Sequence, residues 1–166
     1  HPDDEVFGCG GAIANHIAHG IKVEVVILTH GGVGGDATIR QEESLAAAAC
    51  LGYGEPEFWN LTDRELSASL TISDRLSELI IARGIDLLYA PSPWEIHPDH
   101  RACSELALQA IKLVGTKCRL AFYEVGAPLR PNTVLDITSH ALIKRAAIEC
   151  FASQLSNQNY CLKTDE

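Results

Sequence analysis

Short apolar runs alternate with longer amphipathic stretches along this chain. Residues 22–29 (KVEVVILT) are rich in β-branched side chains and lie between Gly20 and Gly31, which is typical of a buried parallel strand. Similar short runs, bounded by turn-forming residues, occur at residues 57–61, 85–90, 119–124 and 134–137. The pattern therefore predicts five strands.

The segments between these runs have helical periodicity. In residues 71–83, Ile72, Leu76, Leu79 and Ile80 fall on one face of a helix. Strands that alternate with helices indicate an α/β domain with an open, mainly parallel sheet and helices on both faces. From the length of 166 residues we expect a single domain over residues 1–166. The predicted helices are residues 6–19, 37–51, 71–83, 101–114 and 139–154.

Two short motifs combine histidine with aspartate, HPDDE at residues 1–5 and HPDH at residues 97–100. Each motif alone is an ordinary turn sequence, because Pro-Asp and Asp-Asp are common turn residues. Two such motifs in one chain favour a shared functional site. Both follow strand positions, and ligands of open α/β sheets bind at the carboxyl ends of the strands.

The residue types in these motifs match an open zinc site, which has three protein ligands and a position for water. We predict that His1, Asp4 and His100 bind the metal. Asp3 is left to act as a base, because neighbouring side chains of a turning backbone point in different directions. His97 and His100 are three residues apart, so an opening helical turn that begins at Pro98 would place both on one face.

Several other segments, taken with these motifs, resemble one family. The glycine loop at residues 31–35, an R-x-x-E helix with an alanine run, and Tyr123-Glu124 are similar to the LmbE-like or PIG-L family of metal-dependent N-acetylglucosaminyl deacetylases. The resemblance implies a Rossmann-like fold whose central first strand lies upstream of residue 1, so we expect this chain to be truncated at its N-terminus. It also implies that the substrate is a small amino-sugar conjugate that loses its N-acetyl group.

The motif residues suit this reaction. Zinc would activate water and polarise the carbonyl, and iron(II) fits the same N/O ligands. Asp3 would take the proton of the water, and His97 would stabilise the oxyanion of the tetrahedral intermediate. Asp99 would orient an imidazole, although a first-turn helix acid is the plain alternative. Asp3, His97 and Asp99 are therefore the predicted catalytic residues.

Three residues outside the motifs are candidates for substrate binding. Arg40 lies in the first turn of the predicted helix 37–51, where the resemblance implies substrate contact and the alternative is a surface pair with Glu42 or Glu43. Asp63 follows a strand and is either a hydroxyl ligand or a turn residue. Trp94 would form an apolar wall for a sugar ring or pack against the protein.

The glycine loop also suggests a nucleotide-binding alternative, but its spacing is not G-x-G-x-x-G and it follows the second strand of the resembled fold. We expect the loop to lie close to a ligand, with Asp36 or Thr38 capping the next helix. The resemblance further makes His140 a weaker candidate site residue.

The net charge and the amino-acid composition exclude some classes of binding partner. The net charge of −9 argues against nucleic acid and against an anionic membrane surface. No stretch is long and apolar enough to insert into a membrane. The six cysteines contain no C-x-x-C pair, so we expect reduced, buried thiols and a cytoplasmic location, with homo-oligomerisation left open. Alternative functions are hydrolysis of another acyl amide or a phosphate ester, and a non-catalytic sugar- or nucleotide-binding domain.

Overall fold

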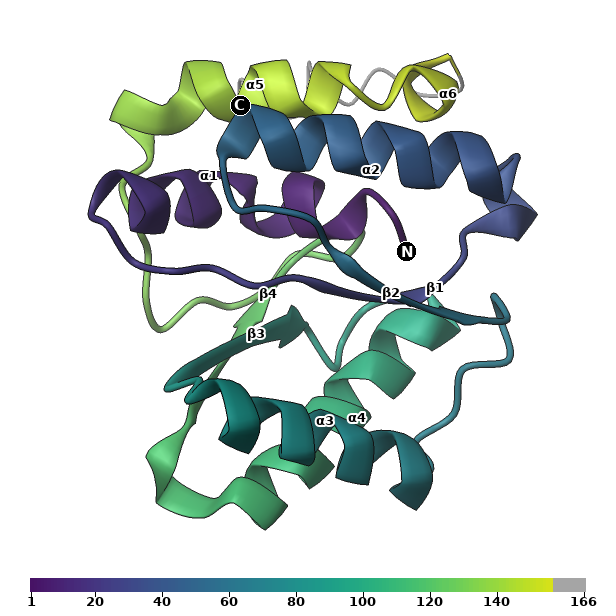
Figure 1. Ribbon diagram of the computed structural model, residues 1–166, viewed down its shortest axis with the longest axis vertical. Helices are drawn as coiled ribbons and strands as arrows, with labels where there is room; N and C mark the ends of the chain where they lie inside the picture. Colours follow the sequence, from purple (N-terminus) through teal and green to yellow (C-terminus); the bar gives the residue numbers. More distant parts are fainter. Residues whose placement is uncertain (157–166) are drawn as a thin grey trace. The chain divides into compact units, whose positions relative to one another are not determined.

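A computed structural model describes residues 1–156, which form two compact units (Figure 1). Unit 1 contains residues 1–63 and 131–156, and unit 2 contains residues 64–130. The prediction of a single domain over residues 1–166 stays a prediction.

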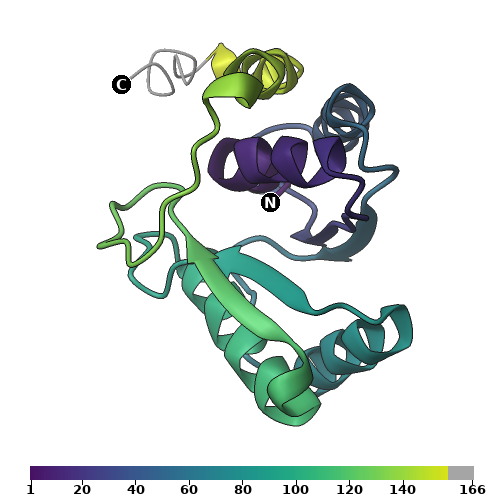
Figure 2. The same ribbon diagram turned by 90° about the vertical axis from the view of Figure 1, so that its left-hand side faces the viewer.

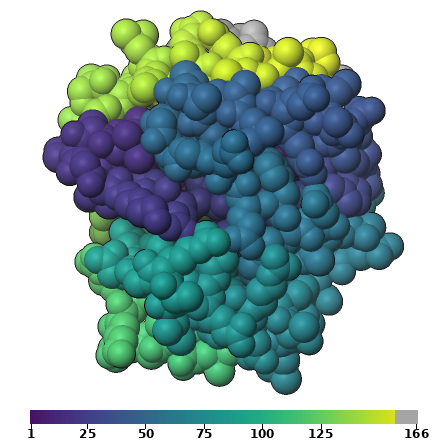
Figure 3. Space-filling model, viewed as in Figure 1, coloured from purple at the N-terminus to yellow at the C-terminus, as the bar shows by residue number. Residues whose placement is uncertain are grey.

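Unit 1 is built from three layers. Its strands β1 (Val26–Thr29) and β2 (Glu57–Leu61) pair in parallel, with Val26 opposite Glu57. Helices α1 (Asp4–Ala18) and α2 (Ala37–Leu51) lie between this strand pair and the C-terminal helices α5 (Ala141–Glu149) and α6 (Ala152–Leu155) (Figures 1 and 2). Figure 3 shows the atoms of α5 lying along those of α2, and α1 also packs against α5.

Unit 2 is a smaller α/β unit. Strands β3 (Leu87–Pro91) and β4 (Arg119–Tyr123) pair in parallel along their whole length, from Leu87 opposite Arg119 to Pro91 opposite Tyr123. Helix α4 (Pro98–Val114) packs against both strands and against α3 (Leu70–Arg83) (Figure 2). The HPDH motif therefore forms the end of the β3–α4 connection and the first turn of α4.

The amphipathic pattern explains the helices. Helix α2 covers the predicted residues 37–51, because Asp36 caps its N-terminus by accepting from the N–H groups of Thr38 and Ile39, while Gly52 ends it in a left-handed conformation. The predicted α/β class and the five helical regions are confirmed, and Pro98 occupies the first turn of α4 as expected.

The described strands form two separate two-stranded sheets, and the expectation of a central strand upstream of residue 1 stays a prediction. Two details of the prediction are wrong. Residues 134–137 form no strand, and Val134 is 85% exposed there, so no neighbouring strand covers its apolar side chain. The predicted helix 139–154 is interrupted at Phe151, whose side chain is fully buried and packs edge-on against Phe7 at a ring-centroid distance of 5.6 Å.

The described cysteines are free thiols. The five described cysteines form no disulfide with one another, and only Cys9 and Cys118 are buried, which corrects the prediction that the thiols are generally buried. Cys161 lies outside the described residues. Among residues 1–156, the helices are all too short or too polar to cross a membrane.

Candidate functional site

The predicted site residues divide between the two units. His1, Asp3, Asp4, Arg40 and Asp63 belong to unit 1, and the other four, Trp94, His97, Asp99 and His100, belong to unit 2.

Asp3 occupies an unusual backbone conformation at the entry to α1. Its φ is 138°, a region that non-glycine residues adopt only when the surroundings hold them there. Two neighbours provide that restraint: Glu5 Oε2 accepts the Asp3 N–H at 2.9 Å, and Arg40 Nη2 donates to Asp3 Oδ2 and to the Pro2 carbonyl, both at 2.8 Å. The predicted base is thus held in one position.

Burial dominates the electrostatics of this carboxylate. Asp3 is only 7% exposed, and burial together with the nearby Asp4 charge raises its pKa well above the usual range, although the Arg40 guanidinium acts in the opposite direction. A carboxylate with a raised pKa is a stronger base than an exposed aspartate, and the Arg40 guanidinium favours the ionised form that can accept a proton.

Glu5, which accepts the Asp3 N–H, is itself held by hydrogen bonds. Its Oε1 accepts hydrogen bonds from Ser44 Oγ at 2.9 Å and from the Tyr53 hydroxyl at 3.5 Å, and burial raises the pKa of Glu5. Glu5 therefore links α1 to α2 while it fixes the backbone of Asp3.

Arg40 is buried and is not on the helix surface. Its exposed fraction is 4%, and Nη1 donates to the Gly31 carbonyl at 2.8 Å in addition to the two bonds of Nη2. The alternative of a surface pair with Glu42 or Glu43 is wrong, because the Arg40 side chain is buried. Glu43 instead accepts from the Ser153 hydroxyl and N–H at 2.6 and 2.7 Å. The predicted substrate contact of Arg40 stays a prediction.

Asp63 anchors the glycine loop. Its two carboxylate oxygens accept the N–H groups of Gly31 and Val33, each at 2.8 Å. Burial alone would raise the pKa of Asp63, but these two hydrogen bonds, together with Thr29 and His30, lower it below its usual value. Gly31 has φ 75°, and a Cβ there would lie 2.6 Å from Arg40 Nη1, so only glycine fits.

His1 and Asp4 form the ligand-type pair of unit 1. His1 Nδ1 lies 2.9 Å from Asp4 Oδ2, and ligand atoms of His1 and Asp63 lie within 4.8 Å of each other. Imidazole nitrogen and carboxylate oxygen are suitable ligands for zinc or iron, so this donor set fits a metal ion.

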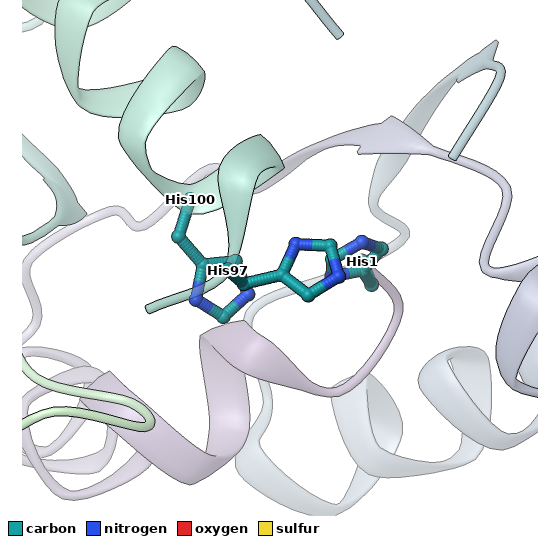
Figure 4. Close-up of side chains that lie close together, drawn as sticks. All are labelled: His1, His97 and His100. Atoms are coloured by element: carbon teal, nitrogen blue, oxygen red, sulfur yellow. The ribbon is translucent and has the colours of Figure 1, made fainter. Parts of the chain in front are cut away.

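His97 and His100 lie in and next to the first turn of α4, as predicted (Figure 4). Their ring centroids are 5.0 Å apart and they offer ligand atoms within 4.8 Å of each other. His97 Nδ1 caps the helix by accepting the Asp99 N–H at 3.2 Å. Nδ1 therefore bears no proton, and in the neutral ring the proton sits on Nε2.

Asp99 lies in the first turn of α4, and its Oδ2 accepts the Arg64 N–H at 2.7 Å. The same oxygen is 3.9 Å from His97 Nδ1, which is beyond hydrogen-bond distance. Asp99 is thus a first-turn helix acid that holds the chain at Arg64, and its role in orienting an imidazole stays a prediction.

Trp94 and His140 differ in their surroundings. Trp94 is 70% exposed, which contradicts the alternative that it packs within the protein, and its predicted contact with a sugar stays a prediction. His140 is half-buried in unit 1, in a short 3-10 turn (Thr138–His140) before α5.

Glu95 contacts the predicted site residue His100, a contact that the sequence analysis missed. It is 2% exposed, and its Oε2 lies 3.3 Å from His100 Nδ1. The only sequence signal is an acidic residue five positions before a ligand-type histidine, within a loop without periodicity.

Comparison with known proteins identifies the family. The PIG-L family model, described as GlcNAc-PI de-N-acetylase, matches residues 1–111, which is more than half of the chain. The chain belongs to the PIG-L family. The motifs HPDDE and HPDH both lie within the matched part of this PIG-L chain.

The relatives of the PIG-L chain include two kinds of enzyme. Diacetylchitobiose deacetylase of Thermococcus kodakarensis is 31% identical over 127 residues, which cover 69% of this chain and 48% of the relative. 4-Oxalmesaconate hydratase of Pseudomonas putida is 32% identical over 187 aligned residues, 93% of this chain and 71% of the relative. The PIG-L chain thus spans about half the length of the deacetylase.

A solved structure supports the fold assignment. A conserved protein of Thermus thermophilus covers 99% of the PIG-L chain with a TM-score of 0.89 and 27% identity, and the chain covers 81% of that protein. The α/β architecture is therefore that of the family.

Proposed function

We propose that this chain removes an N-acetyl group from an N-acetylglucosamine-type amino-sugar conjugate in a metal-dependent hydrolysis. The observation that carries the proposal is the buried Asp3 carboxylate. It is fixed at φ 138° by Arg40 and Glu5, next to the His1–Asp4 pair. Such restraint is favourable where a base must be positioned before the reaction.

The proposed metal ligands are His1 and Asp4 of unit 1 and His100 of unit 2. When bound, zinc or iron(II) supplies Lewis-acid activation of a water molecule and of the substrate carbonyl. The donor chemistry supports this set, because all three residues offer N or O ligands and none is a thiol.

Asp3 then acts as the general base and takes a proton from the attacking water. His97 presents Nε2–H, because its Nδ1 is the helix cap, and this N–H donates to the developing oxyanion. One such donor contributes roughly 3 kcal/mol to transition-state stabilisation. The protonated Asp3 returns its proton to the leaving amine, with His97 as the competing acid.

Substrate recognition is assigned to Arg40, Asp63 and Trp94. The glycine loop lies between Asp63 and Arg40, and Trp94 presents an exposed indole that can stack on the apolar face of a sugar. The similarity to a diacetylchitobiose deacetylase supports a chitooligosaccharide as the first substrate to try.

The experiment is acetate release from a panel of N-acetylglucosamine conjugates, including N,N′-diacetylchitobiose, by protein loaded with zinc or iron(II). We expect release that stops with a chelator and returns with metal. Release that continues unchanged in a chelator would contradict the metal-dependent mechanism. Hydrolysis of only other acyl amides or phosphate esters would keep the metal site and overturn the substrate class.

A second candidate, hydration of an unsaturated polycarboxylate, is favoured by one observation. The Pseudomonas putida hydratase matches 93% of this chain at 32% identity. In that reaction the base would take a proton from water, the hydroxyl would add to one carbon of the double bond, and the base would return the proton to the other carbon. Loss of absorbance from a conjugated polycarboxylate, with no acetate from the sugar panel, would decide for the hydratase.

A further inference from the structure

Glu95 lies at the centre of a buried hydrogen-bond cluster in unit 2. Its Oε1 accepts the N–H groups of Val125 at 2.7 Å and Ala127 at 3.4 Å, and its Oε2 accepts the N–H of Gly126 at 3.0 Å. The same Oε2 lies 3.3 Å from His100 Nδ1. One carboxylate therefore joins the first turn of α4 to the loop that follows β4.

The chemistry of the pair fixes the state of the imidazole. An ionised carboxylate only accepts hydrogen bonds, so His100 Nδ1 must carry the proton in this contact. Three backbone N–H groups donate to the Glu95 carboxylate, an arrangement that favours its ionised form. In the neutral ring the lone pair then resides on Nε2, the atom available as a metal ligand.

We propose that Glu95 is a positioning residue that holds His100 in the Nδ1–H tautomer and couples its ring to residues 125–127. This inference rests on the proposed function in one respect, because it takes His100 as a metal ligand. Carboxylate partners of ligating histidines orient the ring and raise its basicity, and their loss typically weakens metal binding 10- to 100-fold.

The loop at residues 125–127 is connected to His100 through Glu95 Oε2, which contacts both the His100 ring and the Gly126 N–H. Metal binding at His100 should therefore stabilise the loop conformation, and a change in the loop should alter metal affinity. A change at Gly126 should weaken metal binding although this residue carries no side chain. A Cβ at Gly126 would lie 3.3 Å from Glu95 Oε2, so Gly126→Ala displaces the oxygen that contacts His100.

The test uses three variants of the full chain: Glu95→Gln, Gly126→Ala and the control Glu105→Gln, which removes an exposed carboxylate from α4. The first measurement is the tautomer of His100 in metal-free protein, from the ¹⁵N shifts of the ring at pH about 8.5, above the usual histidine pKa. His100→Gln assigns the signal. We expect the Nδ1–H form in the native chain and in Glu105→Gln, and a loss of that preference in Glu95→Gln and Gly126→Ala.

The second measurement is zinc affinity by competition with a chelator. We expect a 10- to 100-fold loss for Glu95→Gln, a smaller loss for Gly126→Ala, and a change below about twofold for Glu105→Gln. If Glu95→Gln does not fold, Gly126→Ala decides by the same two measurements.

An unchanged tautomer with affinity within about threefold of native in the variants would overturn the proposal. If the native chain binds neither zinc nor iron(II), the proposed function fails. The tautomer then still decides the role of Glu95: a retained Nδ1–H form in the variants overturns that role, and its loss supports it.

Discussion

The contribution of Asp63 to the free energy of unfolding can be estimated from its hydrogen bonds. Each of its carboxylate oxygens accepts one backbone N–H of the glycine loop at 2.8 Å, and the side chain is 5% exposed. In Asp63→Asn the amide oxygen replaces one acceptor, while the NH₂ group faces the other N–H. One charge-assisted hydrogen bond is lost and a buried donor is left unsatisfied, which costs about 1.5–3 kcal/mol.

The loss of stability caused by Asp63→Asn should decrease as the pH falls. The pKa of Asp63 is lowered in the folded protein, so its stabilisation is present above the unfolded pKa of about 3.9 and is lost as pH falls through the folded pKa. The difference in free energy of unfolding between native and Asp63→Asn should therefore be full at pH 7. It should shrink as pH falls from about 5 toward 3.

Urea unfolding of metal-free protein, followed by tryptophan fluorescence, measures this difference. The chain has two tryptophans, and Trp59 is buried in β2 of unit 1, so a Trp94→Phe background makes the signal specific to the unit that contains Asp63. Asp74→Asn, which changes an exposed aspartate of unit 2, is the control. A difference below about 0.5 kcal/mol at pH 7, or one that does not change with pH, would refute the reasoning.

Two further predictions concern the glycine loop of unit 1 and the residues proposed for metal binding and catalysis. Gly31→Ala should destabilise the protein and lower turnover more than Gly20→Ala. Both glycines have positive φ (75° and 72°), but only the Cβ at Gly31 would meet Arg40, whereas at Gly20 nothing lies within 4 Å. Urea unfolding and initial rates compare the two, and equal effects would show that contact with Arg40 is unimportant. Asp3→Asn should keep the metal and lose turnover roughly 10²- to 10⁴-fold, whereas His100→Ala should lose the metal itself. Metal content and rate on each variant test this, and a near-native rate in Asp3→Asn would overturn the base assignment.

Local signals predicted much of the fold. The bounds of α2 follow from Asp36 at its N-cap and Gly52 at its end, and β2 coincides with the predicted run at residues 57–61. The apolar pattern could not predict the interruption at Phe151, because a buried aromatic continues the helical periodicity of residues 139–154. The run at residues 134–137 has strand propensity but finds no partner strand among the described residues, and strands are stabilised by cross-strand pairing.

Part of the site could also be predicted. Pro98 at the start of α4 indicated that His97 and His100 would share a helical turn, and the structure confirms this. The backbone N–H groups that donate to Asp63 and Glu95 could not be predicted, because each lies about 30 residues away in the chain. The sequence suggested a surface or substrate role for Arg40, whereas its guanidinium is bonded to Asp3 inside unit 1.

Acetate release is the most direct test of the central claim, that the chain is a metal-dependent deacetylase. It would be measured on the N-acetylglucosamine panel while metal is added to metal-free protein. We predict no release without metal, a rate that rises until one ion is bound per chain, and little release from Asp3→Asn at the same metal content. No acetate from any conjugate at full metal occupancy would contradict the claim.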